Sequence, residues 1–458
     1  MLEFIQKSEE EFYKIFSRLK KRDFSGNEGQ AIKNSTFQLS STLLAKLGSL
    51  VFTIIIARLL MPELFGLYSL ALATILLISS LSDFGISTAL ITFVSKSLEK
   101  KNNSKAKAYF KELIKYKFYL VILGSVILIL SSYFISHFYY NKPIFLALLA
   151  GALYLPIVNL SGFFETAFKS SNDFKIPFFK EILFQIFKLT LIPFGIFLLL
   201  KLNLLTEFLV MSIIILLTIC YSLSFIFLIC FSKKKLNYLN LDSKNLTFSE
   251  KKELRFFLYP LIATTLSGVF LGYVDTILLG HFVEEKFIGY YSSAFSLIGA
   301  ASSILGFIGA AIFPIFARLK GKNLNIAFKK TINLTFLISL FGAIFSLIFA
   351  NFIIKIAYGY AYESSVILLQ IFSILLIIMP ICSIYEIYFL YQEKSKALAK
   401  LLVFAAILNV ILNYVFIIYF LKFGMFYALI GSCIAVISSR LVYLISLKIF
   451  KKKLFPKS

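Results

Sequence analysis

Residues 37–68 of the sequence read FQLSSTLLAKLGSLVFTIIIARLLMPELFGLY. Residues 37–60 are mostly apolar and are long enough for one helix to cross a bilayer. Met61, Pro62 and Glu63 then interrupt the run, and a second apolar stretch starts at Phe65. This segment therefore predicts two membrane-spanning helices joined by a short turn.

The composition of the whole chain extends this prediction. Of the 458 residues, 59% are hydrophobic, only 15% are charged, and the mean hydropathy is +0.87. Soluble domains contain about 45–50% apolar residues. The composition therefore excludes soluble enzymes, nucleic-acid binders and disulfide scaffolds. No disulfide or zinc site is expected, because the four cysteines lie inside apolar runs: Cys220, Cys230, Cys382 and Cys433.

Polar residues, glycines and prolines divide the apolar sequence into twelve stretches of spanning length. The predicted spans are residues 37–60, 65–92, 116–136, 144–166, 178–199, 206–230, 257–281, 289–316, 331–352, 364–390, 399–420 and 425–447. The chain is thus expected to be an all-α protein that crosses the membrane twelve times.

The basic residues predict the orientation of these spans. If the N-terminus is cytoplasmic, 38 of the 47 lysines and arginines fall in cytoplasmic segments and five in outer connections. Cytoplasmic loops of membrane proteins carry an excess of Lys and Arg. Both termini are therefore expected in the cytoplasm. Much of the net charge of +24 follows from topology, so no nucleic-acid partner is needed.

A short repeat divides the chain into two halves. Residues 66–71 and 289–294 both read Gly-x-Tyr-Ser-x-Ala, and they follow spans 1 and 7 respectively. Because each half has six spans, the halves enter the membrane from the same side and form parallel repeats, which suit alternating access. The predicted units are a cytoplasmic N-terminal segment with an amphipathic helix at 2–19, an N-lobe, a cytoplasmic loop, a C-lobe and a basic tail: residues 1–36, 37–231, 232–256, 257–447 and 448–458.

Four motifs resemble those of polysaccharide flippases in the multidrug/oligosaccharidyl-lipid/polysaccharide exporter superfamily. They are ARLLMPELFGLY at 57–68, SDFG at 82–85, YVD at 273–275 and LNVILN at 408–413. The resemblance runs over about residues 35–450, although Met61 stands where the family commonly has glycine.

This resemblance implies a function as well as a fold. The fold would be two six-helix lobes arranged as a V in the cell membrane. The protein would move a polyprenyl-diphosphate-linked oligosaccharide from the inner to the outer leaflet, as O-antigen or teichoic-acid exporters do. Apart from the resemblance, a monomer is the default expectation, and partnership with other glycan-assembly membrane proteins is left open.

A diphosphate cargo predicts cationic groups inside the lobes, where a charge in a span suggests function. Lys46 and Lys188 lie near the middle of spans 1 and 5, and we expect both to contact the diphosphate. Arg58 and Arg440 are further candidates, nearer the ends of their spans. The alternatives are that Lys188 pairs with Glu181 or that these side chains extend to the membrane surface.

The C-lobe carries acids and amides instead. Asp275 lies deep in span 7, Asn409 and Asn413 share one face of span 11, and Glu386 lies in span 10. Carboxylate and amide oxygens can hold Na⁺, and the aspartate alone can hold a proton. In the alternative interpretation, the amides only hydrogen-bond between helices.

Other functions have less support in the sequence. There is no phosphate-binding glycine loop, no catalytic residue is predicted, and His137 and His281 lie too far apart in the chain to suggest a metal site. A glycan polymerase would need a large outer loop, and the outer connections are short. An ion-coupled exporter of small molecules, from the same superfamily, remains the alternative.

Overall fold

The computed structural model describes residues 26–202, 204–242, 245–318, 321–392 and 394–454, so the predicted helix at 2–19 lies outside the described residues. The described elements are all helical. Eleven described segments are long and apolar enough to cross a membrane. One of them contains two crossings divided at Met61, so the prediction of twelve crossings is confirmed.

The first half of the chain forms the N-lobe. Its elements are α2 (Gly26–Ser80), α3 (Ile86–Glu99), α4 (Asn103–Phe134), the π-helix η1 (Ile135–Tyr140), α5 (Phe145–Ser170), α6 (Lys175–Lys201), α7 (Thr206–Lys235) and the 3-10 helix η2 (Asn237–Asn240).

The second half forms the C-lobe. Its elements are α8 (Phe248–Phe282), α9 (Glu285–Arg318), α10 (Gly321–Ala357), the 3-10 helix η3 (Tyr360–Tyr362), α11 (Ser365–Phe372), α12 (Leu375–Tyr391), α13 (Ser395–Leu421) and α14 (Met425–Leu454).

Two local breaks shape the first two crossings. Met61 has φ 59° and ψ 169°, and Pro62 starts the next helix at a position where its missing N–H costs nothing. This backbone region strongly favours glycine, so Met61 stores strain in the turn. The predicted continuous span at 65–92 is wrong, because residues 81–85 form a turn with positive φ at Phe84 and Gly85.

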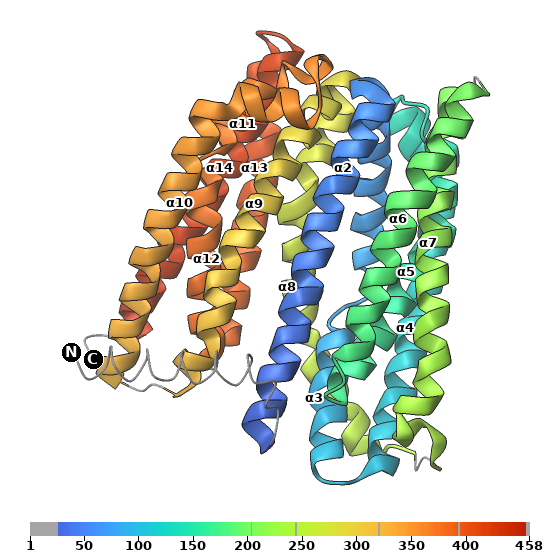
Figure 1. Cartoon of the computed structure of the whole chain (residues 1–458), viewed down its shortest axis with the longest axis vertical. Helices are drawn as coiled ribbons and strands as arrows, with labels where there is room; N and C mark the ends of the chain where they lie inside the picture. The colour runs from blue at the N-terminus through green and yellow to red at the C-terminus, as the bar shows by residue number, and fades with distance from the viewer. Residues whose placement is uncertain (1–25, 203, 243–244, 319–320, 393, 455–458) are drawn as a thin grey trace.

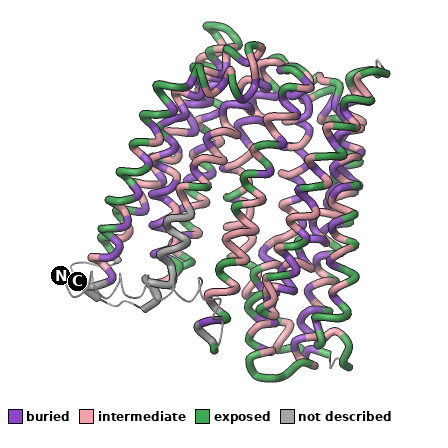
Figure 2. The backbone as a smooth tube through the Cα atoms, in the orientation of Figure 1, coloured by how far each residue is buried: buried purple, intermediate pink, exposed green. Residues whose placement is uncertain are grey.

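The lobes meet at one end and diverge toward the other (Figure 1). We call these the upper and lower ends, after their place in Figure 1. One hydrophobic core continues through both lobes and includes Phe65 and Leu70 of α2 with Leu279 and Tyr291 of the C-lobe. Toward the lower end each lobe has its own core. The structure therefore has the predicted V shape, and buried segments gather where the lobes meet (Figure 2).

Helix α8 is the exception to this separation. Its upper half packs in the C-lobe, but its lower half rests on the N-lobe. The rings of Phe257 and Phe93 are 5.2 Å apart, and Lys105 of α4 forms a 2.6 Å ion pair with Glu250 of α8. The first helix of the C-lobe therefore connects the two lobes along its length.

Candidate functional site

The two copies of the Gly-x-Tyr-Ser-x-Ala motif pack against each other at the upper end. A Cβ atom on Gly66 would lie 2.0 Å from the carbonyl oxygen of Glu285. Reciprocally, a Cβ atom on Gly289 would lie 2.1 Å from the carbonyl oxygen of Pro62. Only glycine allows backbones to approach so closely. We call the packing of residues 57–71 against the C-lobe the upper contact.

Arg58 strengthens the upper contact from the N-lobe side. Its Nε donates a hydrogen bond of 2.7 Å to the carbonyl oxygen of Ala357, and its guanidinium also donates to the carbonyl oxygen of Ile356. The last carbonyls of a helix lack partners within the helix and attract cations. Arg58 therefore caps α10 of the opposite lobe. Arg58 lies twelve residues after Lys46, which is about 18 Å along α2 at 1.5 Å per residue.

Polar groups surround the upper contact. Nδ1 of His281 lies 2.5 Å from the carbonyl oxygen of Tyr139, and the two rings stack at 4.7 Å. Burial lowers the pKa of Lys142, in the loop after η1, while Glu284 and Glu285 of the C-lobe oppose that shift. Opening the upper end would expose these groups and break their interlobe interactions.

Lys188 is buried on α6, at 4% exposure, in the middle of the N-lobe. Its Nζ donates a 3.2 Å hydrogen bond to Oγ of Ser49 on α2. The same nitrogen lies 5.0 Å from the ring centre of Phe52 and 5.1 Å from that of Phe184. Aromatic faces attract a cation without neutralising it. Among the described residues, no carboxylate forms an ion pair with Lys188.

The neighbouring acids are satisfied by other groups. Glu181 accepts a 2.6 Å hydrogen bond from Nε2 of Gln185 and lies 3.6 Å from Nζ of Lys180. Glu165 on α5 pairs with Lys169 at 2.7 Å and with Lys180 at 3.4 Å. The alternative that Lys188 pairs with Glu181 is therefore not what the structure shows. Lys188 therefore has no direct carboxylate partner among the described residues, and Glu181 acts on its charge only from a longer distance.

Lys46 lies on α2 one turn below Ser49, and its side chain is exposed. Positions three apart share a helix face, so Lys46 lies on the face of α2 that meets Lys188. Close approach of α2 and α6 depends on Gly48, where a Cβ atom would lie 2.3 Å from Oε1 of Gln185. The structure thus brings Lys46 and Lys188 to adjoining turns of one interface, whereas Arg58 is elsewhere.

Asp275 of α8 is buried, at 1% exposure, in the C-lobe. Its Oδ2 accepts a 2.5 Å hydrogen bond from the hydroxyl of Tyr291 on α9. Its other oxygen, Oδ1, is buried and has no hydrogen-bond partner in the described part of the chain. A buried carboxylate oxygen without a partner is costly. Oδ1 of Asp275 is therefore open to a hydrogen-bond donor or a cation.

Asn409 and Asn413 of α13 join the same network through serines of α14. Ser432 donates to Oδ1 of Asn413 at 2.7 Å and lies 3.5 Å from the hydroxyl of Tyr291. Oδ1 of Asn409 accepts from Asn413 at 3.1 Å and from Ser439 at 2.9 Å. Both amide oxygens are therefore engaged by protein donors. The structure gathers the predicted residues, but only Asp275 offers an unused oxygen.

The two remaining candidates lie below this network. Arg440 of α14 donates a 2.9 Å hydrogen bond to the carbonyl oxygen of Leu271 in α8. Glu386 of α12 accepts a 2.9 Å hydrogen bond from the hydroxyl of Tyr443. Arg440 therefore lies in the C-lobe with the acids, and the structure does not bring it to Lys46 and Lys188.

A further buried cation of the N-lobe, Lys117, was not predicted from the sequence. Nζ of Lys117 on α4 lies 2.9 Å from Oδ1 of Asp83 and 2.8 Å from Oδ1 of Asn159 on α5. The amide of Asn159 in turn donates to Ser79 at 2.7 Å. This group anchors the turn at residues 81–85. The sequence pattern did not indicate a role for Lys117, because it lies at the edge of a basic segment, where lysines are common.

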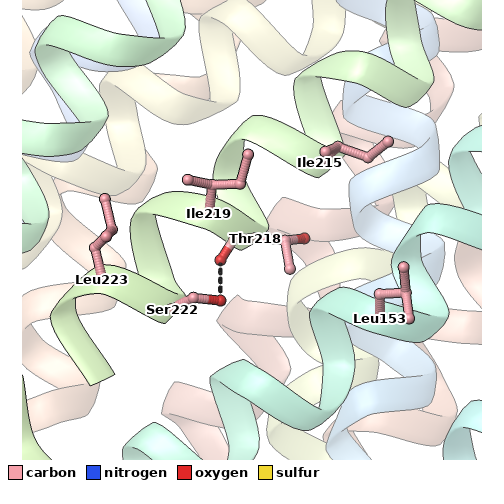
Figure 3. Close-up of a pocket in the computed structure, with 6 residues that line it drawn as sticks. All are labelled: Leu153, Ile215, Thr218, Ile219, Ser222 and Leu223. Atoms are coloured by element: carbon pink, nitrogen blue, oxygen red, sulfur yellow. Dashed lines mark hydrogen bonds between the residues drawn. The ribbon is translucent and has the colours of Figure 1, made fainter. Parts of the chain in front are cut away.

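The pocket in Figure 3 does not belong to these sites. It has a volume of about 160 Å³ and lies between α5 and α7. Its hydroxyls donate to carbonyls of their own helix, so it offers little for polar recognition. Its lining residues are Leu153, Ile215, Thr218, Ile219, Ser222 and Leu223.

With this geometry established, comparison with known proteins identifies the family. The model of the polysaccharide biosynthesis protein family matches residues 31–320. The chain belongs to the polysaccharide biosynthesis protein family. The MatE family model matches residues 260–415 as well. Membership confirms the resemblance carried by the four sequence motifs, and both models describe transporter-type proteins of one superfamily.

A curated relative of this polysaccharide biosynthesis family member is a putative O-antigen transporter of Escherichia coli (strain K12). It is 28% identical over 177 residues, which cover 36% of this chain and 41% of the relative. The aligned part therefore spans less than half of the relative's length.

Solved structures share the fold. An inward-facing multidrug resistance MATE family transporter has a TM-score of 0.70 at 13% identity, covering 90% of this chain and 96% of the other. The lipid II flippase MurJ, in an inward closed conformation, has a TM-score of 0.68 at 16% identity, covering 90% and 87%. Such similarity shows that this chain has the fold of these proteins.

Proposed function

We propose that this protein is a flippase that carries a polyprenyl-diphosphate-linked oligosaccharide from the inner to the outer leaflet of the cell membrane. The observation that carries the proposal is the buried Lys188, which has no direct carboxylate partner among the described residues and donates to Ser49, one helical turn from the exposed Lys46. Sugars without a charged carrier group would not require a buried ammonium. A diphosphate would supply the missing anion.

The proposed orientation places the lower end in the cytoplasm. The connections at this end hold most of the lysines and arginines, in agreement with the positive-inside rule. The lobes have separate cores there and a common core at the upper end. The polar head of the cargo would therefore enter between the lobes from the cytoplasm, while its lipid tail stays in the bilayer. Separation of the upper contact would release the head outward.

We further propose that a small monovalent cation drives this cycle through Asp275. Oδ1 of Asp275 is a buried carboxylate oxygen without a hydrogen-bond partner among the described residues, and it can accept a proton or a Na⁺ ion. The amides of Asn409 and Asn413 would hold the surrounding helices in place, because their oxygens already accept hydrogen bonds.

The first prediction tests the N-lobe cations. Lys188→Ala is expected to lower flipping by about tenfold or more, because a charged hydrogen bond to the diphosphate is lost. Lys46→Ala should lower it by about threefold, since an exposed charge is screened by water. The measurement is the share of lipid-linked oligosaccharide that a membrane-impermeant lectin reaches on intact spheroplasts of a deletion strain carrying each variant.

Lys201→Ala is the matched control, because Lys201 lies on the same helix, at its upper end, and is exposed. It should flip like the wild-type protein. If Lys188→Ala inserts normally and flips at the wild-type rate, the diphosphate site is not at Lys188. If deletion leaves the leaflet distribution unchanged in a host without a second flippase, the flippase function itself is wrong.

The second prediction tests ion coupling. Asp275→Asn removes the charge while keeping the shape of the side chain. In proteoliposomes loaded with lipid-linked oligosaccharide extracted from the deletion strain, wild-type flipping should respond to a Na⁺ or proton gradient. The variant should lose that response, and the two gradients distinguish the ions. Glu99→Gln, an exposed change on α3, is the control. A variant that still responds would exclude Asp275 as the ion site.

A second function is favoured by one observation. The MatE model matches residues 260–415, where Asp275 lies, and MATE transporters share the fold. An ion-coupled exporter of small molecules would need Asp275 but not Lys188. Drug efflux that survives Lys188→Ala and is abolished by Asp275→Asn would support this alternative.

A further inference from the structure

Among the C-lobe elements in the upper contact, helices α8 and α9 are joined by a side-chain hydrogen bond. At the end of α8, a Cβ atom on Gly280 would lie 2.4 Å from Cδ1 of Leu70 in the N-lobe. At the start of α9, Gly289 meets Pro62 in the same way. Below these contacts, the hydroxyl of Tyr291 reaches across to Asp275.

The position of Tyr291 links the upper contact to the C-lobe network. Tyr291 is the tyrosine of the second Gly-x-Tyr-Ser-x-Ala motif and follows Gly289 by two residues. Its ring is fully buried and packs edge-on against Phe372 at 5.4 Å. This close packing holds the side chain in place relative to the backbone of α9. A shift of the hydroxyl away from Asp275 therefore moves the backbone that contacts Pro62.

The hydroxyl of Tyr291 also occupies an oxygen that a cation would use. It donates to Oδ2 of Asp275, which leaves only Oδ1 free. The other ionisable groups that act on Asp275 are Arg440 and Cys433, both from α14. Neutralising the carboxylate weakens a charge-assisted hydrogen bond to roughly half its strength.

We propose that the Tyr291–Asp275 hydrogen bond holds the upper contact closed, and that a cation taken up by Asp275 opens it by releasing the tyrosine. This inference rests on the proposed ion-coupled flippase, because it assigns the step by which the ion acts. Tyr291 is thus a positioning residue that couples the ion site to the contact between the lobes.

The third prediction uses a double-mutant cycle that requires no ion. Spin labels at Leu205 and Phe423, exposed residues at the upper ends of the two lobes, report their separation by double electron–electron resonance. The native cysteines are first replaced by serine or alanine. Tyr291→Phe should raise the ratio of open to closed molecules by about tenfold, the effect of one charged hydrogen bond. Asp275→Asn should raise it by a smaller factor, because the amide oxygen still accepts a neutral hydrogen bond.

Because both changes act on the same bond, which Tyr291→Phe removes and Asp275→Asn only weakens, the double variant should open no further than Tyr291→Phe alone. Tyr358→Phe is the matched control: this buried hydroxyl in the same lobe donates to the carbonyl of Ser293 at 3.1 Å, away from Asp275. Its label distances should equal those of the wild-type protein.

Unchanged distances in Tyr291→Phe, or fully additive effects in the double variant, would overturn the inference. The outcome is separable from the proposed function. If flipping responds to neither the Na⁺ nor the proton gradient, but the double-mutant cycle is still non-additive, ion coupling is disproved. The hydrogen bond would then only stabilise the closed upper contact. Flipping that responds to a gradient while Tyr291→Phe stays closed would disprove only the role of Tyr291.

Discussion

Gly289→Ala is expected to hold the upper end of the protein open and to abolish flipping. The added Cβ would lie 2.1 Å from the carbonyl oxygen and 2.9 Å from the carbonyl carbon of Pro62. Both atoms belong to the backbone, so no side-chain rotation can relieve the clash. The lobes must separate by more than an ångström, because packed cores do not absorb an extra methyl group without a shift. Gly66→Ala should act in the same way from the opposite lobe.

The measurements are the label distance between the upper ends and the flipping rate. We expect a longer distance and a rate at least about tenfold lower, since a transporter held in one state cannot cycle. Gly299→Ala, on the same helix but with no atom within 4 Å of the new Cβ, is the matched control. It should leave both quantities unchanged. A wild-type label distance in Gly289→Ala would contradict this prediction, because the clash would then be relieved by a local shift that keeps the lobes together.

The repeat that forms this contact was visible in the sequence, and so was the number of crossings. Apolar length and the turn at Met61 and Pro62 decide the crossings, and these are local properties. The packing of Gly66 on Gly289 was not predicted, because no local rule states which surfaces of two repeats meet. The break at residues 81–85 was missed for a related reason. Its residues are apolar enough to continue a span, and the turn depends on Lys117 of another helix reaching Asp83.

In the candidate site, too, some features could be predicted from the sequence and others depend on contacts between helices. The sequence marked Asp275, Asn409 and Asn413 because polar side chains in a span are conspicuous. It gave no sign of Ser432 and Ser439, which are common in membrane helices and usually bond to their own backbone. The sequence left open whether Lys188 pairs with Glu181. The three-dimensional structure shows that the carboxylate of Glu181 interacts with Gln185 and Lys180 instead.

Lys117→Met is expected to cost about 2 kcal/mol of folding free energy, less than the roughly 3–5 kcal/mol for breaking a fully buried ion pair. The amine of Lys117 is almost fully buried, whereas the side chain of Asp83 is 26% exposed, so water partly compensates the carboxylate. The variant would leave Asp83 with a 2.7 Å hydrogen bond from Ser87, and Asn159 would lose the donor to its Oδ1. Thermal unfolding in detergent measures the loss.

Adding Asp83→Asn to Lys117→Met should restore at least half of the lost stability, because the penalty comes from an unpaired charge more than from a lost attraction. Lys115→Met, two residues away on the exposed face of α4, should change the unfolding temperature little. If the double variant is less stable than Lys117→Met, the ion pair contributes net attraction instead. The turn at residues 81–85 would then depend on both charges, and the ion pair between Lys117 and Asp83 would be the cause of the break in the second crossing.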